Sequence, residues 1–134
     1  MRILVIEDDK EAADFLTKGL RESGYAVDHA ADGEEALQKV VMRPPTIVLS
    51  DMVMPRMGGL DLLKSIRADP EISETRFIMV TGHNEPHSVI AAKKAGVNGY
   101  IIKPFNVVAL KQRLEAVLGP IPPAPGPMSA LGTA

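Results

Sequence analysis

Hydrophobic residues along the 134-residue chain form five short apolar runs, and a longer amphipathic stretch follows each run. The runs span residues 3–6, 25–30, 46–50, 77–80 and 100–102, and only the second alternates in part with polar residues. Continuous runs of this length are typical of strands buried on both faces of a sheet. The stretches between them repeat apolar residues at helical spacing. Five strand–helix units in series predict an α/β fold, with a parallel sheet between two layers of helices.

Capping residues and glycines mark where the predicted helices begin and end. Asp9 is a candidate N-cap for the first helix, which Gly24 ends, and Asn106 is a candidate N-cap for the last. Asp32 and Glu35 form a candidate capping box at the start of the second helix. The apolar faces expected to be buried are Ala12, Ala13, Phe15, Leu16 and Leu20 in the first helix, Ala36, Leu37, Val40 and Val41 in the second, Leu60, Leu62, Leu63 and Ile66 in the third, and Val107, Leu110, Leu114, Val117 and Leu118 in the last.

Composition narrows the class of protein. Hydrophobic residues make up 46% of the chain and charged residues 24%, as in globular proteins. The net charge of −2 provides no basic excess for binding nucleic acid. The absence of cysteine excludes disulfides, thiolate metal sites and cysteine nucleophiles. The apolar N-terminal stretch is too short for a signal peptide or a membrane span, which predicts a cytoplasmic location and no membrane partner.

The composition changes after Leu118. Residues 1–118 form the predicted domain, whereas residues 119–134 are rich in proline and glycine and carry no charged side chain. This composition predicts a disordered tail or a linker. The sequence leaves open whether the protein stands alone or was cut from a longer chain.

Polar side chains follow four of the five predicted strands. Glu7 and Asp8 follow the first strand, Asp51 follows the third, Thr81 ends the fourth and Lys103 follows the fifth. Ligands of open parallel sheets bind outside the carboxyl ends of the strands, so we expect these side chains to lie together. Converging carboxylates repel one another and favour a hard cation with oxygen ligands, such as Mg²⁺. With an ammonium and a hydroxyl added, the site suits a phosphate, and a carboxylate there can form an aspartyl-phosphate.

Four motifs give the chain its resemblance to the receiver domain of bacterial two-component response regulators, a family that includes chemotaxis regulators. The motifs are Ile6-Glu7-Asp8-Asp9, Ser50-Asp51-Met52-Val53-Met54-Pro55 with Gly58-Gly59, Val80-Thr81-Gly82, and Tyr100-Ile101-Ile102-Lys103-Pro104-Phe105. All four occur in order at the ends of predicted strands, which makes the combination specific. The resemblance extends to about Leu118 and implies a flavodoxin-like, doubly wound sheet with strand order 2-1-3-4-5.

The resemblance implies roles for the residues around the phosphoryl group. Asp51 would be the phosphoacceptor, Thr81 would hydrogen-bond the phosphoryl group and Lys103 would pair with one of its oxygens. Tyr100 would be the switch residue whose rotamer follows the movement of Thr81. The peptide bond between Lys103 and Pro104 is expected to be cis, an isomer common only before proline.

The cofactor that the resemblance implies is Mg²⁺. Asp8 and Asp51 would bind the ion directly, Val53 through its backbone carbonyl and Glu7 through water. The side chains of Val53 and His83 would line the path of the water that hydrolyses the phosphoryl group. Because valine cannot orient water, we expect slow self-dephosphorylation.

The resemblance implies a signalling switch rather than an enzyme, one that promotes only its own phosphorylation and dephosphorylation. A sensor histidine kinase or a phosphotransfer protein would donate the phosphoryl group. The response would be a changed surface over the fourth helix, fifth strand and fifth helix, within residues 87–118. The kinase, the target and the oligomeric state, a monomer or a phosphorylation-dependent dimer, stay open.

Other interpretations of the same residues are available. Glu7 and Asp8 could simply complement the start of the first helix, and Tyr100 could be a core aromatic. A receiver that accepts no phosphate would be a phosphate-independent binding module, but the complete set of site residues argues against it. A phosphatase with an aspartyl nucleophile usually has a second acid two residues further on, where this chain has Val53.

Overall fold

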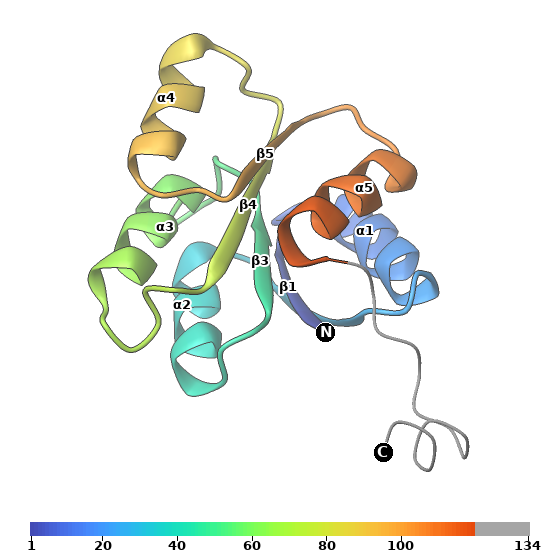
Figure 1. Cartoon of the computed structure of the whole chain (residues 1–134), viewed down its shortest axis with the longest axis horizontal. Coiled ribbons are helices and arrows are strands. Elements are labelled where there is room, and N and C mark those ends of the chain that lie inside the picture. Colours follow the sequence, from blue (N-terminus) through green and yellow to red (C-terminus); the bar gives the residue numbers. More distant parts are fainter. Residues whose placement is uncertain (120–134) are drawn as a thin grey trace.

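The computed structural model describes residues 1–119, in which five strands alternate with five helices (Figure 1). The rest of the predicted tail, residues 120–134, lies outside the described residues. No helix within the described part is long and apolar enough to cross a membrane. The elements are β1 (Arg2–Ile6), α1 (Lys10–Glu22), β2 (Ala26–Ala30), α2 (Gly33–Met42), β3 (Ile47–Ser50), α3 (Gly59–Ala68), β4 (Arg76–Thr81), α4 (Pro86–Lys94), β5 (Gly99–Ile102) and α5 (Val107–Leu118).

The five strands are parallel and lie in the order β2-β1-β3-β4-β5, which confirms the predicted topology. The chain leaves β1 toward β2 and then returns to the other side of β1 to form β3. This reversal of direction leaves a crevice at the carboxyl ends of β1 and β3, the usual ligand site of such sheets. Ile6 pairs with Ser50, so the residues that follow these two strands emerge side by side.

Helices α1 and α5 cover one face of the sheet, and α2, α3 and α4 cover the other (Figure 1). Successive strand residues point to opposite faces. Ile3 and Val5 therefore join the core under α1 and α5, whereas Leu4 and Ile6 join the core under α2 and α3. Because both faces are buried, the central strands β1, β3 and β4 are apolar at every position except their ends, where Arg2, Ser50, Arg76 and Thr81 lie.

The helix ends follow the predicted capping chemistry. The Asp9 carboxylate accepts the backbone N–H groups of Glu11 and Ala12 at 2.9 and 3.3 Å, and the Asn106 side chain accepts one at the start of α5. Gly24, just after α1, has a φ of 101°, a conformation that glycine adopts without strain. The capping box of α2 is only half formed: Asp32 accepts the Glu35 N–H, but the Glu35 carboxylate binds the N–H of residue 31 instead of that of Asp32.

Two residues that we expected on buried helix faces are exposed. Phe15 in α1 is 57% exposed and Val41 in α2 is 53% exposed, so both predictions were wrong. Each residue directly precedes or follows a buried neighbour, Leu16 or Val40, and one residue turns a helix by about 100°. The helix face that packs against the sheet therefore includes fewer residues than the apolar positions of the sequence suggest.

The contrast between a buried and an exposed phenylalanine gives a test of the core. Phe77 in β4 is completely buried, so Phe77→Ala should lower the free energy of unfolding by about 3–5 kcal/mol. Phe15→Ala is the matched control and should change it by less than about 0.5 kcal/mol. Urea denaturation followed by circular dichroism measures both values. Equal losses in the two variants would contradict the assignment of the core.

Candidate functional site

A cleft of about 610 Å³ lies at the carboxyl ends of the strands and gathers the predicted polar residues other than Thr81. Its walls come from segments that are far apart in the sequence. They are Glu7, Asp8 and Asp9 after β1, Asp51 after β3, Lys103, Pro104 and Phe105 after β5, and Ala12, Phe15 and Leu16 of α1. The cleft thus has an acidic floor with one cation and an apolar rim.

The Lys103 ammonium lies between two carboxylates of this cleft. Its Nζ is 2.7 Å from Oε1 of Glu7 and 2.8 Å from Oδ2 of Asp51. The Glu7 side chain is only 4% exposed, and the contact with Lys103 offsets part of the cost of burying its carboxylate. Burial alone would lower the pKa of Lys103, but its hydrogen bonds to Asp51 and Glu7 outweigh burial and raise the pKa above the ordinary value. The peptide bond between Lys103 and Pro104 is cis, as predicted.

Asp51 directly follows β3, and its backbone N–H continues the sheet pairing by donating to the carbonyl of Ile6 at 3.2 Å. Its two carboxylate oxygens have different partners. Oδ1 accepts the backbone N–H groups of Met52 at 2.6 Å and Val53 at 3.4 Å, whereas Oδ2 accepts from Lys103. These donors fix the orientation of the carboxylate, whose side chain remains 16% exposed and open to a reaction partner.

The acids of the cleft have the chemistry that Mg²⁺ prefers. Asp8 is exposed and lines the same cleft as Glu7 and Asp51, so every anionic donor there is a carboxylate oxygen. Within residues 1–119, no three Asp, Glu or His side chains are grouped closely enough to hold an ion by themselves. Mg²⁺ usually binds one or two carboxylates and completes its shell with carbonyl oxygens and water. The residues present therefore fit the ion.

Thr81 and Tyr100 both contact the residue His83. Thr81 is completely buried at the end of β4, and its hydroxyl accepts the backbone N–H of His83 at 3.3 Å. The Tyr100 hydroxyl donates to the backbone carbonyl of His83 at 2.5 Å. Burial, followed by the charges of Glu85 and Asp51, raises the pKa of Tyr100. The two residues are thus connected through one loop, although neither lines the cleft.

Three residues around the cleft were missed by sequence reasoning. A ring nitrogen of His29 in β2 lies 2.8 Å from the backbone oxygen of Glu7, so the imidazole supports the turn that carries the acids. Phe15 and Phe105 form part of the apolar rim. Only the pairing of β1 with β2 could have indicated this role of His29. In that pairing His29 lies opposite Val5, close to the end of β1 that Glu7 follows.

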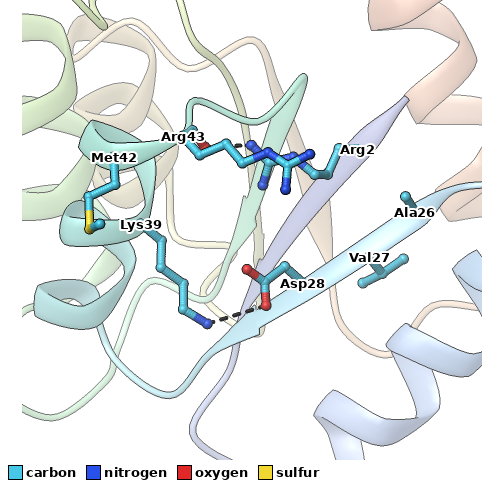
Figure 2. A pocket seen from close by; sticks show the side chains of 7 residues that line it. All are labelled: Arg2, Ala26, Val27, Asp28, Lys39, Met42 and Arg43. Carbon is cyan, nitrogen blue, oxygen red and sulfur yellow. Dashed lines mark hydrogen bonds and ion pairs between the residues drawn. The ribbon is translucent and has the colours of Figure 1, made fainter.

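A second cleft, of about 420 Å³, lies toward the N-terminal ends of β1 and β2 (Figure 2). Basic side chains line it, but they bind other parts of the chain. Arg2 donates to the carbonyl of Arg43 at 2.5 Å, and Lys39 donates to the carbonyl of His29 at 2.5 Å and to Asp28 at 3.2 Å. These bonds attach α2 to the edge of the sheet. This cleft lacks the converging carboxylates of the first.

Comparison with known proteins agrees with this fold and cleft. The family model of the response regulator receiver domain matches residues 3–115. Chemotaxis protein CheY1 of Helicobacter pylori strain J99 is 41% identical over 121 residues, which cover 89% of this chain and 98% of the relative. Chemotaxis protein CheY-3 of Vibrio cholerae is 37% identical over 118 residues, which cover 87% and 91%.

A solved structure extends the agreement to three dimensions. Chemotaxis protein CheY4 of Vibrio cholerae is 32% identical and superposes with a TM-score of 0.83, over 87% of this chain and 98% of that one. The fold and the cleft define a chemotaxis-like receiver domain. The chain belongs to the response regulator receiver domain family.

Lys103→Met tests the ion cluster. It leaves the Glu7 and Asp51 carboxylates facing each other without a cation, and the free energy of unfolding should fall by about 2 kcal/mol at about pH 8. Because the pKa of Lys103 is raised, its contribution is complete below the ordinary value of 10.5. This stabilising contribution is lost as the pH rises through the raised pKa. The free energies of unfolding of native protein and variant should therefore become equal in that range.

Urea titrations over this pH range measure the difference between native protein and variant. Lys94→Met, at an exposed lysine that ends α4, is the matched control and should change little at any pH. A loss in Lys103→Met that stays constant through the alkaline range would contradict the assignment.

Proposed function

We propose that the protein is the phosphoacceptor of a two-component phosphorelay and that Asp51 receives the phosphoryl group. The observation that carries the proposal is the position of Lys103, whose ammonium holds the Asp51 carboxylate at 2.8 Å inside a cleft of further acids. A lone carboxylate at a turn would need no such surroundings. The membership of the receiver family supports the same function.

The donor is a phosphohistidine of a sensor kinase or a phosphotransfer protein. A carboxylate oxygen of Asp51 attacks the phosphorus, a P–O bond forms and the P–N bond of the donor breaks. The electron pair of that bond leaves with the imidazole nitrogen of the donor. Lys103 is already beside the reacting carboxylate and pairs with a phosphoryl oxygen as the charge develops. The protein turns over no other substrate, and the relay operates in the cytoplasm without nucleic acid or a membrane.

Four residues would hold the Mg²⁺ ion. Asp8 and Asp51 offer carboxylate oxygens, Val53 its backbone carbonyl, and Glu7 a carboxylate that would act through water. Lys103 already binds Oε1 of Glu7 at 2.7 Å. When bound, the ion neutralises charge on the transferring phosphoryl group. The backbone N–H of Val53 points back to Asp51, which keeps this loop close to the reacting carboxylate.

The exposed apolar rim of the cleft supports docking of the donor protein. Phe15 projects from α1 as a 57% exposed aromatic and lines the same cleft as the acids and Phe105. Large exposed aromatics beside polar groups are typical of contact sites. A donor that covers this rim would bring its phosphohistidine to Asp51 and exclude water from the transfer.

The switch operates through the loop after β4. The new phosphoryl charge draws Thr81 and Lys103 toward it, and the Thr81 hydroxyl releases the N–H of His83. Tyr100, which binds the carbonyl of the same residue, follows this movement. The result is a shift between two arrangements of the surface formed by α4, β5 and α5.

That surface already presents apolar side chains from each of its three elements. Ile90 of α4, Ile102 of β5 and Val108 of α5 are 51%, 36% and 65% exposed. Such residues suit contact with a target protein or with a second copy of the chain. The proposal therefore includes a monomer that can dimerise on phosphorylation.

Intact mass spectrometry after incubation with acetyl phosphate and Mg²⁺ tests the phosphoacceptor. The native protein should gain one phosphoryl group, because acetyl phosphate can replace the protein donor, and the gain should need the metal. Asp51→Asn should gain none, whereas Asp61→Asn, at an exposed aspartate of α3, should react like the native protein. No gain in the native protein from acetyl phosphate or from a phosphohistidine donor would leave a phosphate-independent binding module as the function.

Val53→Asn tests the lifetime of the phosphoryl group. Val53 is 62% exposed beside Asp51, so the substitution should not disturb the core. Asparagine can orient the attacking water, and the phosphorylated variant should lose phosphate about threefold faster or more. Val108→Asn, at a similarly exposed valine, is the control and should decay at the native rate. A native protein that dephosphorylates faster than Val53→Asn would contradict the expected slow hydrolysis.

A further inference from the structure

The loop between β3 and α3 contains a tight turn with an unusual backbone. The N–H of Met57 donates to the carbonyl of Pro55 at 2.8 Å, which closes a three-residue turn around Arg56. Arg56 has a φ of 66°, in the left-handed region, and it is the only residue other than glycine with a positive φ among the described residues. A residue with a side chain keeps this conformation only where its surroundings hold it.

The Arg56 side chain forms an ion pair with Asp32, the N-cap of α2. Asp32 is 3% exposed, and its two oxygens are divided between two tasks. Oδ1 accepts the N–H of Glu35 at 2.9 Å, and Oδ2 binds the Arg56 guanidinium. A second acid, Glu34, is 4.0 Å away and exposed. The buried carboxylate is therefore the principal partner that holds the turn.

The backbone fits closely at the same place. The N–H of Gly33 donates to the carbonyl of Met57 at 3.1 Å, and a Cβ on Gly33 would lie only 2.4 Å from that oxygen. At the other end of the loop, the N–H of Gly59 donates to the carbonyl of Met52 at 2.9 Å. The segment from Met52 to Met57, which carries Val53, is thus fixed at both ends. One attachment is to the start of α3, and the other is to the start of α2.

We propose that the Arg56–Asp32 pair is a latch that positions the backbone carbonyl of Val53 for the cation. The latch keeps the turn closed and the turn directs the Met57 carbonyl to Gly33. The loop fixed in this way holds Val53 beside Asp51, whose Oδ1 accepts the Val53 N–H at 3.4 Å, and would keep the Val53 carbonyl within reach of a cation bound there. Arg56 and Asp32 are positioning residues, since neither lines the cleft. The inference rests on the proposed function, because it assigns these residues to the metal site of that function.

Two conservative substitutions break the pair from opposite sides. Arg56→Gln removes the cation, and Asp32→Asn removes the anion while asparagine still caps the helix. Calorimetric titration with Mg²⁺ alone should show affinity reduced about tenfold in each, as when a residue that supports a metal ligand is lost. The double variant should be no weaker than either single variant, because both remove one interaction. Arg56→Lys should restore part of the affinity, and Glu34→Gln should leave it unchanged.

Hydrogen exchange of the metal-free protein gives an independent readout. In both variants the amides of Gly33 and Met57 should exchange faster, because their carbonyl partners belong to the released turn. A residue pair with only a structural role would lower the thermal midpoint without changing Mg²⁺ affinity, and that result would overturn the inference. If the native protein itself binds no Mg²⁺, the proposed function fails first and the latch falls with it. Native binding with unchanged variants would refute the latch alone.

Discussion

The structure depends most on one lysine placed between two carboxylates. The carboxyl ends of the five parallel strands lie at the same end of the sheet. Glu7 and Asp51, which follow β1 and β3, therefore lie close together although both carry a negative charge. Two such anions, one of them buried, would repel each other and destabilise the edge. Lys103 enters from the end of β5 and offsets this repulsion. The same arrangement places a cation beside the Asp51 carboxylate, so one interaction would serve both stability and the proposed phosphoryl transfer.

The order of the strands explains why the acids meet at this point. Because the chain reverses direction between β2 and β3, the turns after β1 and β3 have no crossover helix between them. The central strands are buried on both faces, so the floor of the cleft rests on the close-packed core. Above that floor, the loop after β4 joins Thr81 and Tyr100 through His83. This connection is the route by which the proposed phosphoryl charge would change the surface.

The sequence was sufficient to predict the sheet and the gathering of Glu7, Asp51 and Lys103. The apolar runs locate the strands, and the carboxyl ends of parallel strands lie at the same end of the sheet. It did not predict which apolar helix residues stay outside. Phe15 follows the helical repeat as well as Leu16 does, and only the width of the contact with the sheet separates them. The pairing of Arg56 with Asp32 was equally hidden, since no spacing rule connects a loop residue to a helix cap 24 positions earlier.

The two edge strands of the sheet, β2 and β5, differ in the side chains that bind their backbones. At the β2 edge, Arg21 of α1 and Lys39 of α2 donate to the carbonyls of Val27 and His29. Cationic side chains on an edge prevent another strand from pairing there. In residues 1–119, no side chain binds the backbone of β5 in this way, and Ile102 is exposed on that strand. The β5 edge therefore stays open, and it belongs to the surface of α4, β5 and α5 on which the proposed switch would act.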